Sequence, residues 1–203
     1  MDYFALLGQP RQPWLDPNAL KAAFLEQSAL LHPDRVQATM TEEKAAATTR
    51  FTELNAAYQC LRDPKERLLH LLELETGALA ANVQSVPESA MDLFMETGQA
   101  CREADQFLAT KGRGAAPLLQ AQWFGQSLDW TTRLQAVQER IHLRRDELLA
   151  ELRAMNDTWN AALPLSDRAQ KLPLRRLEEM ARLLGYIARC DGQIHERLTQ
   201  LSF

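Results

Sequence analysis

Residues 28–37 have the sequence SALLHPDRVQ, in which a leucine-rich helical run stops at His32-Pro33-Asp34. Pro33 ends the helix because the residue before a proline is driven out of the right-handed helical region, and its fixed φ angle stiffens the turn. Asp34 carries a carboxylate that suits a bidentate arginine, and His32 can bond through either ring nitrogen. The tripeptide is therefore either a simple helix stop or a rigid, negatively charged corner that another protein recognises.

The patterns on both sides of the tripeptide are helical. Apolar residues recur at spacings of three and four, and no stretch alternates apolar and polar residues as a half-buried β-strand would. Asp16-Pro17 and Asp63-Pro64 are N-cap and first-turn signals, and Gly77 is a helix-ending signal. The helices predicted for this part of the chain are residues 3–7, 17–31, 41–61 and 64–76. The two longer helices are expected to pack against each other in an antiparallel pair.

The rest of the chain predicts a connector at residues 77–86 and a helical bundle at residues 87–203. Its helical patterns cover residues 87–108, 117–155 and 174–201, and Pro164, Ser166 and Pro173 predict a turn before the last of them. Each pattern carries an apolar stripe, and three such helices can bury their stripes only against one another. The predicted fold is all-α, with a compact domain at residues 1–76 followed by a three-helix bundle.

Three stretches of the first domain resemble the J domain, by which DnaJ-type co-chaperones engage DnaK-type ATPases. They are DYFALLG at residues 2–8, ALLHPDR at 29–35 and NAAYQCLRDPKER at 55–67. The continuation LLHLLELETG at residues 68–77 and the C-terminal bundle are more specifically similar to HscB, the J-type co-chaperone of iron–sulfur cluster assembly. The resemblance implies a short first helix, two antiparallel main helices and a short fourth helix.

The resemblance implies that the HPD loop docks on a DnaK/HscA-type chaperone and accelerates ATP hydrolysis there. Asp34 would bind a chaperone arginine, while His32 and Pro33 would shape the loop. The only nearby basic residues are Lys21 and Arg35. At positions where J domains usually carry lysine or arginine, this chain has Leu25, Glu26, Ala29 and Leu30. We therefore expect a small salt effect on association, and a dedicated chaperone or a weak, transient complex.

The HscB resemblance also implies a client, the iron–sulfur scaffold protein IscU, bound through an apolar patch with nearby glutamates. The matching segment is AMDLFMETGQACREAD at residues 90–105, and a further apolar contact falls on the last helix. The implied client-binding residues are Phe94, Met95, Glu96, Gln99 and Leu183. The match is incomplete, because a glycine and an arginine occupy positions that the family fills with apolar and acidic residues. The alternative is that Phe94 and Met95 belong to the bundle core.

Composition argues against several other classes of protein. The net charge of −4 does not suit a nucleic-acid surface, and no run approaches the roughly 18 apolar residues that a membrane helix needs. The cysteines at positions 60, 101 and 190 lie far apart without a CxxC pair, which fits reduced thiols in the cytoplasm. We expect a cytoplasmic protein without a membrane segment or a signal peptide.

No pattern in the sequence predicts an active site, a metal site or a cofactor. His142 is predicted to pair with Glu139 or Asp146 within a helical turn, and His195 with Asp191. GxGxxG, Walker-type and GxSxG motifs are absent. The chain is therefore expected to activate a partner's ATPase and not to be an enzyme itself. The alternatives are a J-domain co-chaperone for a different client, or a helical adaptor that stimulates no ATPase.

One aromatic segment has no role in this scheme. The stretch of residues 112–130, which contains Trp123, Phe124 and Trp130, is longer than a minimal HscB bundle requires. These aromatics either cap the bundle or form an extra contact surface.

Overall fold

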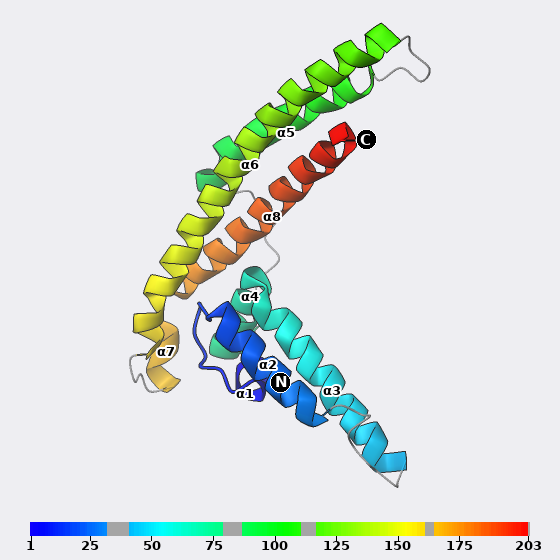
Figure 1. The fold of residues 1–203 in the computed structure, drawn as a ribbon. Coiled ribbons are helices and arrows are strands. Elements are labelled where there is room, and N and C mark those ends of the chain that lie inside the picture. Colours follow the sequence, from blue (N-terminus) through cyan, green and yellow to red (C-terminus); the bar gives the residue numbers. More distant parts are fainter. Residues whose placement is uncertain (32–40, 79–86, 111–116, 161–164, 203) are drawn as a thin grey trace. The chain divides into compact units, whose positions relative to one another are not determined.

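The structure is a computed structural model of the 203-residue chain, and it describes residues 1–31, 41–78, 87–110, 117–160 and 165–202. The described part contains no β-strand, so the all-α prediction is confirmed (Figure 1). The elements are α1 (Tyr3–Leu6), α2 (Pro17–Leu31), α3 (Thr41–Arg62), α4 (Pro64–Thr76), the 3₁₀ turn η1 (Glu88–Ala90), α5 (Met91–Leu108), α6 (Pro117–Asn160), α7 (Leu165–Lys171) and α8 (Leu174–Ser202). No helix in these ranges is long and apolar enough to cross a membrane.

Side-chain caps fix the helix boundaries near the N-terminus. The Asp16 carboxylate accepts hydrogen bonds from the backbone N–H groups of Asn18 and Ala19, at 2.9 and 2.8 Å, where α2 begins. Asp63 caps α4 in the same way, by accepting from the Glu66 N–H at 3.0 Å. Gly77 ends α4 with a φ angle of 70°, a left-handed conformation that glycine adopts without strain. The predicted starts of α2 and α4 and the predicted end of α4 are confirmed.

Contacts between residues divide the chain into two units. The first contains Met1–Val83 and Leu149–Ala181, and the second contains Gln84–Leu148 and Arg182–Phe203. Both α6 and α8 contribute residues to each unit. The predicted division into a domain at residues 1–76, a connector at 77–86 and a bundle at 87–203 stays a prediction.

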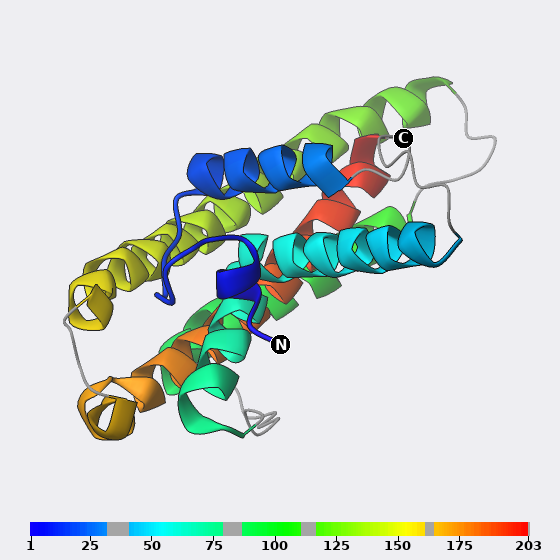
Figure 2. The same cartoon turned by 90° about the horizontal axis from the view of Figure 1, so that it is seen from below.

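The first unit is built on the antiparallel pair of α2 and α3, which lie side by side in two views (Figures 1 and 2). Phe24 of α2 stacks on Tyr58 of α3 with 4.2 Å between the ring centroids. α1 and α4 both contact α3, and apolar side chains fill the space between these helices. The largest fully buried ones are Phe4, Leu7, Leu20, Leu54, Leu61, Leu68 and Leu71.

In the second unit, α5, the first part of α6 and the last part of α8 bury their apolar stripes against one another, as predicted. The buried residues include Ala104, Leu134, Val137, Ile141, Ile187 and Ile194. Ion pairs join the helices at their edges: Glu103 of α5 to Arg133 of α6 at 2.6 Å, and Asp105 of α5 to Arg197 of α8 at 2.9 Å.

Two local predictions differ from the structure. The segment around Ser166 and Pro173 was predicted to be a turn, but it contains the short helix α7. The pairing predicted for His142 is also wrong, because its Nε2 lies 2.9 Å from Asp191 of α8, a residue that also accepts a hydrogen bond from Gln138. Both differences arise from contacts between elements, which spacing along one helix does not reveal.

Candidate chaperone-docking and client-binding surfaces

The HPD tripeptide, His32-Pro33-Asp34, lies outside the described residues, as does Arg35. The helices on either side of it in the sequence are described: α2 ends at Leu31 and α3 begins at Thr41. The stacked rings of Phe24 and Tyr58 join these two helices. The first candidate surface is therefore the end of the α2–α3 pair where α2 ends and α3 begins.

The exposed outer face of α2 lies next to this end of the helix pair. Lys21, the described basic residue predicted to contact a chaperone, is exposed there. Leu25 and Leu30 lie farther along the helix and are 54% and 72% exposed. The face next to the tripeptide is thus more apolar than charged.

The second candidate surface lies on α5. Phe94 and Met95, two of the predicted client-binding residues, are 42% and 59% exposed, and Met91 one turn earlier is also exposed. Large apolar side chains gathered on one exposed helix face are typical of a protein-binding surface. Their exposure argues against the alternative that Phe94 and Met95 belong to the bundle core.

The other predicted client-binding residues are placed differently. Glu96 forms an ion pair with Arg140 of α6, and the Gln99 side chain donates to Glu103 at 2.8 Å. Both side chains therefore already have partners within this chain, although Glu96 stays partly exposed. Leu183 is 0% exposed, and it lies in the core between the helices. The buried side chain of Leu183 does not support the predicted contact with a client.

Sequence reasoning missed the aromatic neighbour of Phe94. Tyr186 of α8 meets the Phe94 ring edge to face, with 6.5 Å between centroids, and the Arg189 guanidinium lies 4.2 Å from the centre of the Tyr186 ring. The spacing of three between Tyr186 and Arg189 was visible in the sequence, but nothing in it indicated that α8 lies beside Phe94. We call Met91, Phe94, Met95 and Tyr186 the α5–α8 patch.

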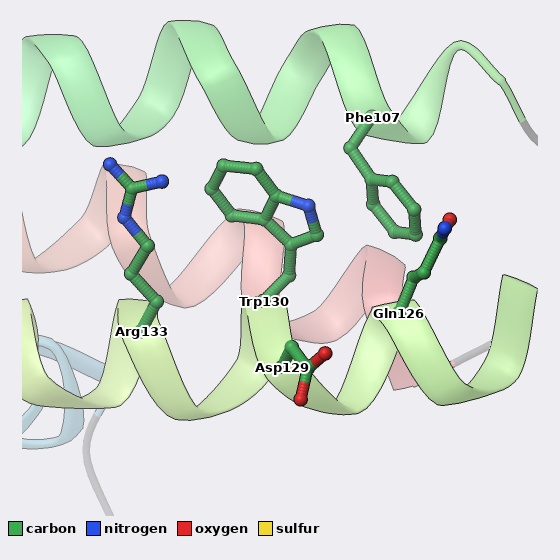
Figure 3. Close-up of a pocket in the computed structure, with 5 residues that line it drawn as sticks. All are labelled: Phe107, Gln126, Asp129, Trp130 and Arg133. Carbon is green, nitrogen blue, oxygen red and sulfur yellow. The ribbon is translucent and has the colours of Figure 1, made fainter.

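Trp130 of α6 packs against Phe107 of α5 (Figure 3). Phe107 of α5 stacks on Trp123 and Trp130 of α6, with centroid distances of 5.4 and 6.0 Å, and Arg133 lies 4.9 Å from the centre of the Trp130 ring. A shallow pocket between Phe107 and Trp130 also has Gln126, Asp129 and Arg133 in its lining. The two tryptophans therefore help to pack the helices, whereas Phe124 is exposed.

Within the described ranges, no three histidine, cysteine or acidic side chains are grouped to hold a metal ion. His70 has a structural position: its Nε2 accepts the backbone N–H of Tyr3 at 3.1 Å. Burial lowers the pKa of His70, which favours the neutral ring that accepts this bond. Burial also raises the pKa of Cys101, so its thiol stays protonated at neutral pH.

Comparison with protein families identifies the domain formed by the first helices of the chain. The family profile of the DnaJ domain matches residues 2–70. Residues 2–70 are a DnaJ domain. The DnaJ domain comprises α1, α2 and α3 and the first half of α4, and it includes the HPD tripeptide in its sequence.

The similarity to solved structures extends beyond the DnaJ domain. The chaperone HscB from Vibrio cholerae superposes with a TM-score of 0.65 and 21% sequence identity, over 99% of this chain and 99% of that one. The human co-chaperone protein HscB superposes with a TM-score of 0.65 and 17% identity, over 97% of this chain and 81% of that one. At these identities the likeness shows the fold. The chain thus has an HscB-like fold in which the DnaJ domain is the N-terminal third.

Proposed function

We propose that the chain is a co-chaperone that binds a DnaK/HscA-type chaperone in the cytoplasm and stimulates its ATP hydrolysis. The observation that carries this proposal is the DnaJ domain at residues 2–70, with His32-Pro33-Asp34 in its sequence between the ends of α2 and α3. The Asp34 carboxylate accepts hydrogen bonds from an arginine of the chaperone, and Pro33 restricts the loop that carries it. The chain is then an activator of ATP hydrolysis and not itself an ATPase.

The test is the steady-state ATPase rate of the DnaK/HscA-type chaperone from the same organism, with increasing amounts of this chain. The rate is expected to rise and saturate, and Asp34→Asn is expected to abolish the rise because the neutral amide loses the charge-assisted bonds. Glu66→Gln is a matched control, since it removes a partly exposed carboxylate from α4 of the same unit. A wild-type chain that leaves the rate unchanged would contradict the proposal and favour the helical adaptor.

The client we propose is an iron–sulfur scaffold protein of the IscU type, bound at the α5–α8 patch. The exposed Phe94 and Met95 support this assignment, and so does the HscB-like fold that extends through α5, α6 and α8. Binding a client and a chaperone on one chain raises the effective concentration of each beside the other. The carboxylate of Glu96 next to the patch is paired with Arg140 but partly exposed, and it offers the client a hydrogen-bond acceptor.

Calorimetric titration of the chain with the purified scaffold protein tests the client. Met95→Ser and Phe94→Ser are expected to weaken binding about tenfold each, because each removes apolar surface from the contact. Leu143→Ser is the matched control, since Leu143 is an exposed leucine on α6 outside the patch. If the chain stimulates the ATPase but does not bind the scaffold protein, the co-chaperone assignment stands and the client is a different protein.

A further inference from the structure

The outer face of α2 is nearly uncharged. Its inner side is occupied by Leu20, which is buried, and by Phe24, which stacks on Tyr58. Among the α2 side chains that the structure describes, the exposed ones are Pro17, Asn18, Ala19, Lys21, Ala22, Leu25, Glu26, Ala29 and Leu30. Lys21 and Glu26 are the only charged residues between Pro17 and Leu31, so the net charge of the helix side chains is zero.

The two leucines are the largest apolar side chains on this face. Leu25 is 54% and Leu30 is 72% exposed, although most of the other leucines of this unit are buried. Single exposed leucines are common on protein surfaces. Here, however, Ala29 lies between the two leucines on the helix surface and Ala22 lies one turn before Leu25, so the four residues form an apolar strip with Glu26 beside it. We call Ala22, Leu25, Ala29 and Leu30 the α2 strip.

The position of the α2 strip identifies the partner that covers it. α2 ends at Leu31, and the next three residues are the HPD tripeptide. A chaperone that binds the tripeptide therefore meets Leu30 first and then Leu25 along the same helix. An acidic chaperone surface gains little from a helix without net charge, whereas an apolar surface gains by removing both leucines from water.

We propose that the α2 strip docks on an uncharged, apolar surface of the chaperone that binds the HPD tripeptide. This inference rests on the proposed function, and it adds the chemistry of the partner's surface. Burial of Leu25 and Leu30 then supplies much of the affinity, and long-range electrostatic attraction supplies little. Apolar burial is insensitive to moderate salt, whereas the attraction between exposed charges is screened within about 10 Å at 0.1 M salt.

The experiment measures the concentration of the full chain that gives half-maximal stimulation of the chaperone's ATPase. Leu25→Ser and Leu30→Ser are each expected to raise this concentration about tenfold, with the maximal stimulation at saturation unchanged. Lys21→Ala is expected to have a smaller effect than either. Between about 50 and 300 mM salt, the wild-type value is expected to change less than about threefold. Leu143→Ser is the control, and helicity by circular dichroism is expected to be the same for all variants.

Three outcomes would overturn the proposal in distinguishable ways. If the wild-type chain stimulates but loses affinity steeply with salt, and Lys21→Ala is more harmful than Leu25→Ser, then the face acts by charge and the proposed function stands. If sedimentation shows a wild-type dimer that Leu25→Ser converts to a monomer, then a second copy covers the strip. If the wild-type chain gives no stimulation at any concentration, the proposed function fails, and the docking role of the strip fails with it.

Discussion

His70 is a buried imidazole that holds the first helix of the chain in place. Its Nε2 accepts the Tyr3 N–H at 3.1 Å, and its ring stacks on Phe4 with 5.9 Å between centroids. Burial lowers the pKa of His70, and Glu73, whose carboxylate lies 3.8 Å from Nδ1, opposes this only in part. A protonated Nε2 cannot accept the Tyr3 hydrogen bond, so stability is coupled to pH at this residue.

The direction of the pH effect follows from the lowered pKa. An unfolded histidine titrates near pH 6.5, and His70 in the folded chain titrates below that value. The contribution of His70 to the free energy of unfolding is therefore complete above about pH 6.5 and is lost as the pH falls through the folded pKa. As the pH falls from about 7.5 to 5, urea denaturation is expected to show a steeper loss of the free energy of unfolding for the wild type than for His70→Gln. The glutamine side chain has no group that titrates at position 70. Parallel pH curves for the two proteins would contradict this coupling.

Arg67 is a second buried polar residue, and it connects distant backbone groups. Its Nε donates to the Pro13 carbonyl at 2.9 Å, and its Nη1 donates to the Leu61 carbonyl at 2.7 Å. Burial lowers the pKa of Arg67 to about 10, so the guanidinium is still charged at neutral pH. The bond to Pro13 was not predictable, because nothing in the sequence relates Arg67 to a carbonyl 54 residues away.

Replacing Arg67 tests the value of these bonds. Arg67→Met keeps an unbranched side chain of moderate length but leaves two buried carbonyl groups without their donor, and we expect a loss of about 1–3 kcal/mol in the free energy of unfolding. Lys65→Met, at a partly exposed position of the same helix, is expected to change it by less than about 0.5 kcal/mol. Guanidinium denaturation of both variants and the wild type measures the difference. Equal losses for the two variants would show that the Arg67 bonds contribute nothing.

At the scale of the element, local signals predicted the helices that carry their own caps. Asp16 and Asp63 mark the starts of α2 and α4, and Gly77 marks the end of α4, because each of these residues satisfies backbone groups within its own turn. α7 has seven residues, too few for a helix that is stable alone. It was predicted to be a turn, since the contact that holds it comes from α4.

That contact is a bidentate ion pair between Arg168 of α7 and Glu75 of α4. The Arg168 guanidinium donates to both carboxylate oxygens at 2.8 and 2.6 Å, and these hydrogen bonds raise the pKa of Arg168. Only 3% of the Glu75 side chain is exposed, so the carboxylate depends on this partner. Breaking one side of a buried pair is costly because the remaining charge stays desolvated.

Arg168→Met is therefore expected to lower the free energy of unfolding by about 3 kcal/mol and to loosen α7. Lys171→Met in the same helix is the control, because Lys171 forms an exposed pair with Asp167 that is worth less than about 0.5 kcal/mol. Thermal denaturation measures the stability, and amide exchange of residues 168–171 measures the order of α7. Similar exchange in Arg168→Met and Lys171→Met would mean that another contact holds α7.

At the scale of the whole molecule, the sequence predicted the helices and the exposed part of the candidate patch, but not the residues that neighbouring helices bring together. Phe94 and Met95 were assigned to a surface because of their resemblance to family positions, and both are exposed. Leu183 was assigned to the same surface, but it belongs to the buried stripe of α8. Tyr186 was missed because the position of α8 beside Phe94 follows from bundle packing and not from any local pattern.

The contacts of Trp14 connect the two stretches of sequence that make up the first unit. The backbone N–H of Trp14 donates to Asn156 Oδ1 at 3.0 Å, and Asn156 Nδ2 donates to the Trp14 backbone carbonyl at 2.9 Å. The Arg153 guanidinium lies 4.8 Å from the centre of the indole ring. These α6 residues are absent from a fragment of residues 1–76, although the fragment contains all of the DnaJ domain. The segment around Trp14 should therefore be less ordered in the fragment than in the whole chain.

Two measurements test this dependence. Trp14 is the only tryptophan among residues 1–76, so the fluorescence of that fragment reports on it alone, and we expect emission typical of a solvated indole. In the whole chain, Asn156→Ala is expected to speed the exchange of the Trp14 amide at least about tenfold and to lower the free energy of unfolding by about 1–3 kcal/mol, since it removes both hydrogen bonds. Asp157→Ala, at the exposed neighbouring position, is the control and should change neither quantity. If Trp14 is as protected in the fragment and in Asn156→Ala as in the wild type, the DnaJ domain orders this segment without α6.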